Sequence, residues 1–132
     1  MKKLTSILFA TVFAAAIATA GDKAGVADIG HDDLKQAMKD NKVTLIDVNG
    51  SESYKKGHIP GAIDFEANKD SFAAKLPQDK EALVVAYCGS EQCKAYKQAA
   101  TKAQELGYKN VKHYSKGISG WKKSGEKTEP GA

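Results

Sequence analysis

The stretch that decides the fold is LVVAYCGSEQCK, residues 83–94. Residues 83–87 form a nearly continuous apolar run, which is typical of a strand covered on both faces of a parallel sheet. Cys88 ends this run, and a short polar loop follows before residues 94–106, whose apolar members share one helical face. Gly107 then stands where a helix commonly ends in a left-handed cap. The pattern predicts a strand, a loop that begins at Cys88, and a helix.

Strand-like and helix-like segments alternate along the rest of the chain. Residues 43–48 and 111–114 are further strand candidates, and residues 26–29 and 62–65 are weaker ones. Residues 31–39 carry apolar side chains at helical spacing, with acidic residues in the first turn. Alternation of this kind predicts an α/β fold, a parallel sheet with helices on both faces. Ligands of such sheets bind beyond the carboxyl ends of the strands, where Cys88 lies.

Cys88 is the candidate nucleophile. Backbone N–H groups of the loop after a strand can converge on its sulfur, and the next helix presents its positive end to the same point. Both effects favour a thiolate, so we expect the pKa of Cys88 to fall below the free value of about 8.5. A buried, inert cysteine that ends a core strand is the alternative. The combination of strand, loop and helix favours the reactive thiolate.

The N-terminal segment predicts export. Residues 1–20 combine two lysines, an apolar run and the small residues of a signal-peptidase site, so we expect cleavage after Ala20. The mature protein is then periplasmic or secreted, with no membrane association after cleavage. We expect one domain at residues 21–123 and a flexible C-terminal tail at 124–132.

Charge and histidine placement exclude several function classes. The formal net charge is +4 and all 20 basic residues are lysines scattered along the chain, which does not indicate a nucleic-acid partner. His31, His58 and His113 are far apart and lack metal-ligand spacing, so neither a metal nor another cofactor is expected. Asp47, at a strand end, is a candidate acid–base group, but we expect it instead to hold a loop.

Several segments together resemble the rhodanese family. They are residues 45–48 and 54–63 for its opening motif, 84–88 for its active-site strand and cysteine, and 103–111 and 117–121 for its closing stretch. The resemblance implies a five-stranded parallel sheet and a persulfide carried on Cys88. A sulfane donor such as thiosulfate or polysulfide would load the sulfur, and a thiol or cyanide would remove it. The implied substrate-binding loop comprises Gly89, Ser90, Glu91, Gln92, Cys93 and Lys94.

This chain departs from the family pattern at positions that carry charge. Asn49, Gly89 and Cys93 stand where many rhodaneses have arginine, whose planar fork grips oxyanions in a way that lysine cannot reproduce. Together with Glu91 in the loop, this predicts weak binding of thiosulfate. Lys94 is a candidate point charge in place of arginine, or a solvated lysine of the first helical turn.

Cys93 is a candidate resolving thiol. It could discharge a persulfide on Cys88, releasing sulfide and leaving a disulfide, or it could protect Cys88 from overoxidation. A small residue that packs the helix start is the alternative, and a disulfide closing so small a ring would stabilise the fold little.

The leading function is a sulfurtransferase or persulfide carrier. The alternatives are a thiol–disulfide redox protein that uses Cys88 and Cys93, and a non-catalytic module that binds sulfur or a protein partner. Phosphatase or arsenate reductase chemistry is disfavoured because it relies on a bidentate arginine.

Overall fold

Five parallel strands form a single sheet. The computed structural model describes residues 25–131, and the strand order is β1-β5-β4-β2-β3. The strands are β1 (Ala27–Asp28), β2 (Val43–Asp47), β3 (Ile63–Asp64), β4 (Leu83–Tyr87) and β5 (Asn110–His113). The predicted five-stranded parallel sheet is thereby confirmed, and the predicted signal peptide lies outside the described residues.

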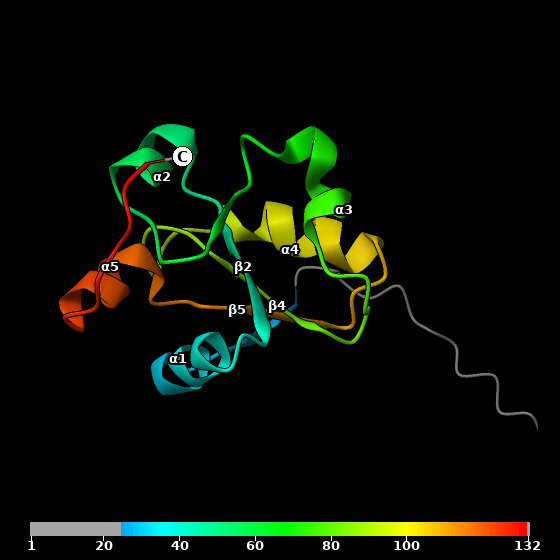
Figure 1. Ribbon diagram of the computed structural model, residues 1–132, viewed down its shortest axis with the longest axis horizontal. Helices are drawn as coiled ribbons and strands as arrows, with labels where there is room; N and C mark the ends of the chain where they lie inside the picture. The colour runs from blue at the N-terminus through cyan, green and yellow to red at the C-terminus, as the bar shows by residue number, and fades with distance from the viewer. Residues whose placement is uncertain (1–24, 132) are drawn as a thin grey trace, which may run out of the picture.

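Helices cover both faces of this sheet (Figure 1). They are α1 (His31–Lys39), α2 (Ser51–Lys56), α3 (Phe72–Lys75, preceded by a 3-10 turn at Lys69–Ser71), α4 (Tyr96–Glu105) and α5 (Gly117–Lys123). Buried side chains of α1, α2 and α5 join one core cluster, and those of α3 and α4 join the other. Between residues 25 and 131, no helix is long and apolar enough to cross a membrane.

The two central strands explain why their sequences are continuously apolar. Successive side chains of a strand point to opposite faces. Leu45 and Val85, which are paired in the register of β2 and β4, belong to the core on the α1 face. Ile46 and Ala86, the next pair, belong to the core under α4. Both faces of β2 and β4 therefore need apolar residues.

Helix α4 packs closely on the sheet because its inner face is made of alanine. Ala99, Ala100 and Ala103 are buried in the core beside β4 and β5. The helix ends as predicted, with Gly107 at a φ of +96°, and the N–H of Tyr108 donates to the carbonyl of Ala103.

The C-terminal segment, predicted as a flexible tail at residues 124–132, makes several contacts with the domain. Glu129 and His58 exchange two backbone hydrogen bonds of 2.9 Å as an isolated antiparallel bridge. The indole Nε1 of Trp121 donates to the carbonyl of Lys127 at 2.8 Å. These contacts hold residues 125–131 against the domain, through backbone groups that composition does not reveal.

Candidate active site

The loop after β4 contains both cysteines. Cys88 directly follows the strand, and the loop turns through a hydrogen bond from the N–H of Cys93 to the carbonyl of Ser90 at 3.1 Å. Helix α4 begins at Tyr96 rather than near Lys94, because the carbonyl of Lys94 accepts from the residue three positions on, as in a tighter turn. The helix therefore begins two residues later than predicted, and the loop extends one residue beyond Lys94.

The two cysteine sulfurs are bonded to each other in the structure. Their Cα atoms are 6.2 Å apart, and five positions separate them in sequence. Cys88 is only 1% exposed, whereas Cys93 is half-buried. In this oxidised form Cys88 is neither a free thiolate nor accessible, so the nucleophile that the sequence predicted requires reduction of the bond.

The loop leaves a set of backbone donors free. Within residues 25–131, the N–H groups of Gly89, Ser90, Glu91 and Gln92 donate to no protein acceptor. Consecutive free amides in a turn are the donors that hold bound anions in proteins. The loop can therefore bind an anionic group without help from a charged side chain.

The carbonyl side of the same loop is held firmly by α5. The N–H of Ile118 donates to the carbonyl of Cys88, and the N–H of Ser119 donates to the carbonyl of Gly89, both at 2.9 Å. The first turn of a helix has N–H groups without intrahelical partners, and here the loop supplies their acceptors. Helix α5 therefore fixes the position of the Cys88 backbone.

Gly117 makes this close approach feasible. It is buried with a φ of +61°, and a Cβ atom added there would lie 2.5 Å from the carbonyl oxygen of Cys88. It would also lie within 3 Å of two backbone atoms of Gly89. Only glycine satisfies both the left-handed conformation and the contact.

A closed polar network lies beside the loop, at the end of β2. The Oδ1 atom of Asp47 accepts from the N–H of Asn49 at 2.8 Å, and its Oδ2 accepts from the hydroxyl of Tyr87 at 2.7 Å. The Tyr87 oxygen in turn accepts from the N–H of Ile59 at 3.0 Å. Burial raises the pKa of Asp47, and burial followed by the charge of Asp47 raises the pKa of Tyr87. Asp47 holds its loop, as predicted.

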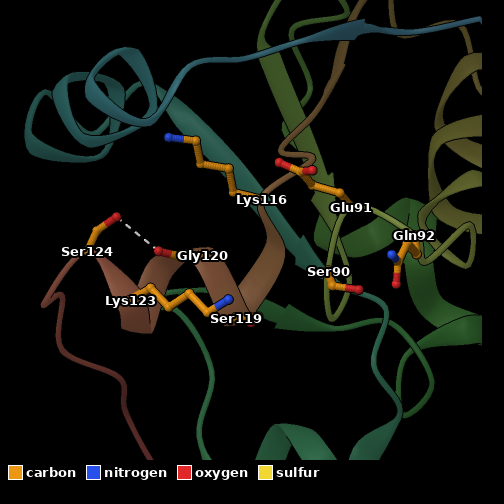
Figure 2. Close-up of a pocket in the computed structure, with 8 residues that line it drawn as sticks. All are labelled: Ser90, Glu91, Gln92, Lys116, Ser119, Gly120, Lys123 and Ser124. Atoms are coloured by element: carbon orange, nitrogen blue, oxygen red, sulfur yellow. Dashed lines mark hydrogen bonds between the residues drawn. The ribbon is translucent and has the colours of Figure 1, made fainter.

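Two cavities flank the loop, and lysines border both. The larger, of about 470 Å³, lies between the loop and α5 (Figure 2). Its lining includes Ser90, Glu91 and Gln92 from the loop and Lys116, Ser119 and Lys123 from the region of α5. The other, of about 290 Å³, touches Gly89 and includes Lys56 and Lys122. In the described part of the chain, Lys116, Lys122 and Lys123 form no ion pair, so unpaired lysines border both cavities, with the Glu91 carboxylate beside them in the larger one.

The structure separates the predicted loop residues into different positions. Gly89, Ser90, Glu91 and Gln92 line one or the other cavity. Lys94 is exposed and lines neither of them.

The histidines have contacts elsewhere. The ring of His58 stacks on the ring of Tyr54, with the two centroids 3.7 Å apart. Its Nδ1 atom is hydrogen-bonded to the backbone carbonyl of Tyr54 at 2.9 Å. Across residues 25–131, no three side chains of His, Cys, Asp or Glu are grouped to hold a metal ion.

Comparison with known proteins identifies the family. Residues 30–124 match the model of the rhodanese-like domain. The chain belongs to the rhodanese-like domain family. This rhodanese-like domain is 34% identical over 101 residues to the HTH-type transcriptional regulator Rv0324 of Mycobacterium tuberculosis, covering 76% of this chain and 43% of the regulator. It is 31% identical over 106 residues to arsenate reductase 2.1 of Oryza sativa subsp. japonica, covering 70% of this chain and 64% of the reductase.

A solved structure supports the same assignment. The crystal structure of the BH2092 protein from Bacillus halodurans shares 30% identity with a TM-score of 0.68, over 79% of this chain and 77% of that one. The rhodanese-like domain thus spans less than two thirds of the two sequence relatives and most of the structural one.

Sequence reasoning missed the residues that position the loop from a distance. Gly117 was part of a family motif, but its contact with Cys88 depends on β5 lying next to β4. The sequence pattern places Tyr87 only in the strand, whereas its hydroxyl joins the network of Asp47. A polar hydroxyl at the end of an otherwise apolar strand was the available signal.

Proposed function

We propose that this rhodanese-like domain is a sulfurtransferase or persulfide carrier that moves sulfane sulfur through a persulfide on Cys88. The observation that carries the proposal is the run of four free amides directly after Cys88, at the carboxyl end of a central strand. Once the disulfide is reduced, these donors favour the anionic sulfur that attacks a donor and the persulfide anion that results. Family membership supports sulfur as the group transferred.

The charges around the loop favour an anionic donor. Lys116, Lys122 and Lys123 attract anions through a field that raises their encounter rate. They do not replace the bidentate grip of arginine on an oxyanion. We therefore propose inorganic polysulfide as a better donor than thiosulfate, whose sulfonate end calls for such a grip.

Oxyanion reduction is the weaker proposal. The similarity to a plant arsenate reductase suggests it, and both chemistries would use a thiolate in an amide-lined loop. Arsenate and phosphate chemistry relies on the fixed guanidinium of an arginine. This chain contains lysine but no arginine, which disfavours that chemistry.

The test is thiocyanate formation by the reduced protein with cyanide as acceptor. Wild type should form thiocyanate faster from polysulfide than from thiosulfate, and Cys88→Ser should form none above background. The matched variant Cys93→Ser removes the other cysteine of the same loop and should retain the cyanide reaction, because cyanide takes the outer sulfur directly. Thiocyanate formation that persists in Cys88→Ser, or is absent from wild type, would exclude the proposed function.

A further inference from the structure

The two cysteines of the loop differ sharply in access. Cys88 is 1% exposed and lies between the strand end and α5, whereas Cys93 is half-buried at the far end of the loop. The fold nevertheless brings their sulfurs into a covalent bond, with Cα atoms 6.2 Å apart. No movement of the domain is needed for one sulfur to attack the other.

We propose that Cys93 is a second catalytic thiol, which discharges the Cys88 persulfide as sulfide and then receives the electrons of a dithiol reductant. This proposal rests on the proposed function, because it needs a persulfide on Cys88. It makes the domain a sulfide-releasing enzyme rather than only a carrier that hands sulfur to an acceptor.

The discharge step balances without an external reactant. The thiol of Cys93 gives up its proton, and the resulting thiolate attacks the inner sulfur of the persulfide, the Sγ of Cys88, while that proton ends on the departing outer sulfur. The bond between the two cysteine sulfurs forms, the bond between Sγ and the outer sulfur breaks, and hydrosulfide leaves with the electron pair. The sulfane sulfur is reduced by two electrons, and the two cysteines are oxidised by one electron each to the disulfide seen in the structure.

Reduction of the disulfide between Cys88 and Cys93 requires a dithiol, and the exposure of the two sulfurs determines which one the dithiol attacks. An external thiolate can reach only the half-buried Cys93, so it forms a mixed disulfide there and Cys88 departs as the leaving thiolate. Thiol exchange is faster when the leaving thiolate is more stable. The proposed direction therefore requires that loop amides, which have no backbone acceptor among residues 25–131 in the oxidised form, donate to the Cys88 thiolate once it is released. The second thiol of the reductant then attacks the mixed disulfide, leaving Cys93 reduced and the reductant oxidised to its own disulfide.

The position of Cys93 explains why this loop uses cysteine there. Its N–H donates to the carbonyl of Ser90, which turns the chain back toward Cys88. An arginine at the same position would add a positive charge that binds an oxyanion. The thiol of Cys93 instead allows the sulfane sulfur to be reduced by two electrons as the disulfide forms.

A single-turnover experiment tests the discharge step. Reduced protein is loaded anaerobically with inorganic polysulfide, desalted, and followed by sulfide determination and intact mass, with no thiol added. Wild type should release close to one equivalent of sulfide and end two hydrogens lighter than the reduced protein. Cys93→Ser should keep the added sulfur and release sulfide at least about tenfold more slowly, since its hydroxyl is not a nucleophile at neutral pH. Cys88→Ser should neither gain sulfur nor form the disulfide.

The outcomes separate this inference from the proposed function. If wild type and Cys93→Ser both retain the added sulfur, Cys93 does not resolve the persulfide, and the sulfurtransferase proposal stands alone. If no variant gains sulfur and wild type releases no sulfide, both proposals fail. The thermal unfolding of Cys93→Ser, compared with that of reduced wild type, checks that the variant is folded.

A second measurement tests the direction of regeneration. Oxidised wild type is mixed briefly with a monothiol, quenched with acid, and cleaved after Glu91, which separates the peptides of the two cysteines. The monothiol should be attached to Cys93. Attachment mainly to Cys88 would overturn the proposed order of attack.

Discussion

The neighbouring strands β2 and β4 end at the same edge of the sheet. Among residues 25–131, the polar groups that follow β2 are satisfied by hydrogen bonds within the protein, whereas several that follow β4 are not. Asp47 and Tyr87 are paired in the register of β2 and β4, so the two loops start side by side. After β2, each carboxylate oxygen of Asp47 accepts a hydrogen bond, one from the N–H of Asn49 and one from the hydroxyl of Tyr87. The Tyr87 hydroxyl oxygen also accepts one, from the N–H of Ile59. After β4, within the described chain, four successive N–H groups have no protein acceptor.

The difference separates polar groups that the protein satisfies itself from donors that remain available to a ligand. Buried polar groups are stabilising only when they are satisfied, which describes the network of Asp47. Donors left free in a loop that is otherwise fixed are available for a ligand, and their positions are set before it arrives. The two loops should therefore respond differently to mutation, one in stability and the other in activity.

Substitution at Gly117 should have the largest effect, and it should fall on activity. Gly117→Ala places a Cβ atom 2.5 Å from the carbonyl oxygen of Cys88, so the loop must shift. Displacement of reacting groups by about 1 Å can lower rates on the order of 100-fold, and we expect a 10- to 100-fold loss of thiocyanate formation. The initial rate with polysulfide and cyanide measures this.

Gly125→Ala is the matched control for that variant. Gly125 also has a positive φ, +78°, but a Cβ atom added there meets nothing within 4 Å. It should cost about 1 kcal/mol of stability from backbone strain and leave the rate nearly unchanged. Equal losses of activity in the two variants would show that backbone strain, and not the contact with the loop, is responsible.

The sequence predicted well what depends on local pattern. The apolar runs of β2 and β4 are long enough to identify both strands, and helix α4 carries its alanine face and its terminal Gly107 in one continuous stretch. Helix α5 was not predicted as a helix because Gly117 and Gly120 interrupt its helical pattern. It forms because Trp121 is buried in the core.

The place of the cysteine loop in the fold was predictable from the sequence, but the burial and the oxidation state of its cysteines were not. The position of Cys88 after a buried strand follows from the sequence, and so does the proximity in sequence of Cys93. The burial of Cys88 and its bond to Cys93 depend on how the loop turns and on the distant carbonyl contacts of α5. Such long-range contacts arise from strand order, which no local pattern encodes.

Removing the hydroxyl of Tyr87 should break the closed network. Tyr87→Phe leaves Oδ2 of Asp47 without its donor and the N–H of Ile59 without its acceptor, and an unsatisfied buried group costs roughly 1–3 kcal/mol. We expect a loss of about 2 kcal/mol in the free energy of unfolding, measured by urea denaturation, with the thiocyanate rate changed little. Tyr54→Phe removes a single hydroxyl bond to the carbonyl of Ala62 in the same core and should cost only about 1 kcal/mol. If Tyr54→Phe lowers the free energy of unfolding more than Tyr87→Phe does, the polar network of Asp47 is not a greater source of stability than a single hydrogen bond.

The smallest effect concerns the pH dependence that Asp47 contributes. Burial raises the pKa of Asp47 in the folded chain, although its hydrogen bonds from Tyr87 and Asn49 oppose the rise. As pH increases from the usual aspartate pKa of about 4 toward the folded value, the folded chain keeps a proton that the unfolded chain has lost, so the free energy of unfolding falls. Above the folded value, the loss is complete and the contribution is constant. Asp47→Asn should lack this downward slope, whereas Asp79→Asn, which changes an exposed turn, should show the wild-type slope in urea denaturation at a series of pH values. A wild-type slope in Asp47→Asn would mean that another carboxyl group carries the proton. The polar network of Asp47 would then contribute nothing to the pH dependence of stability.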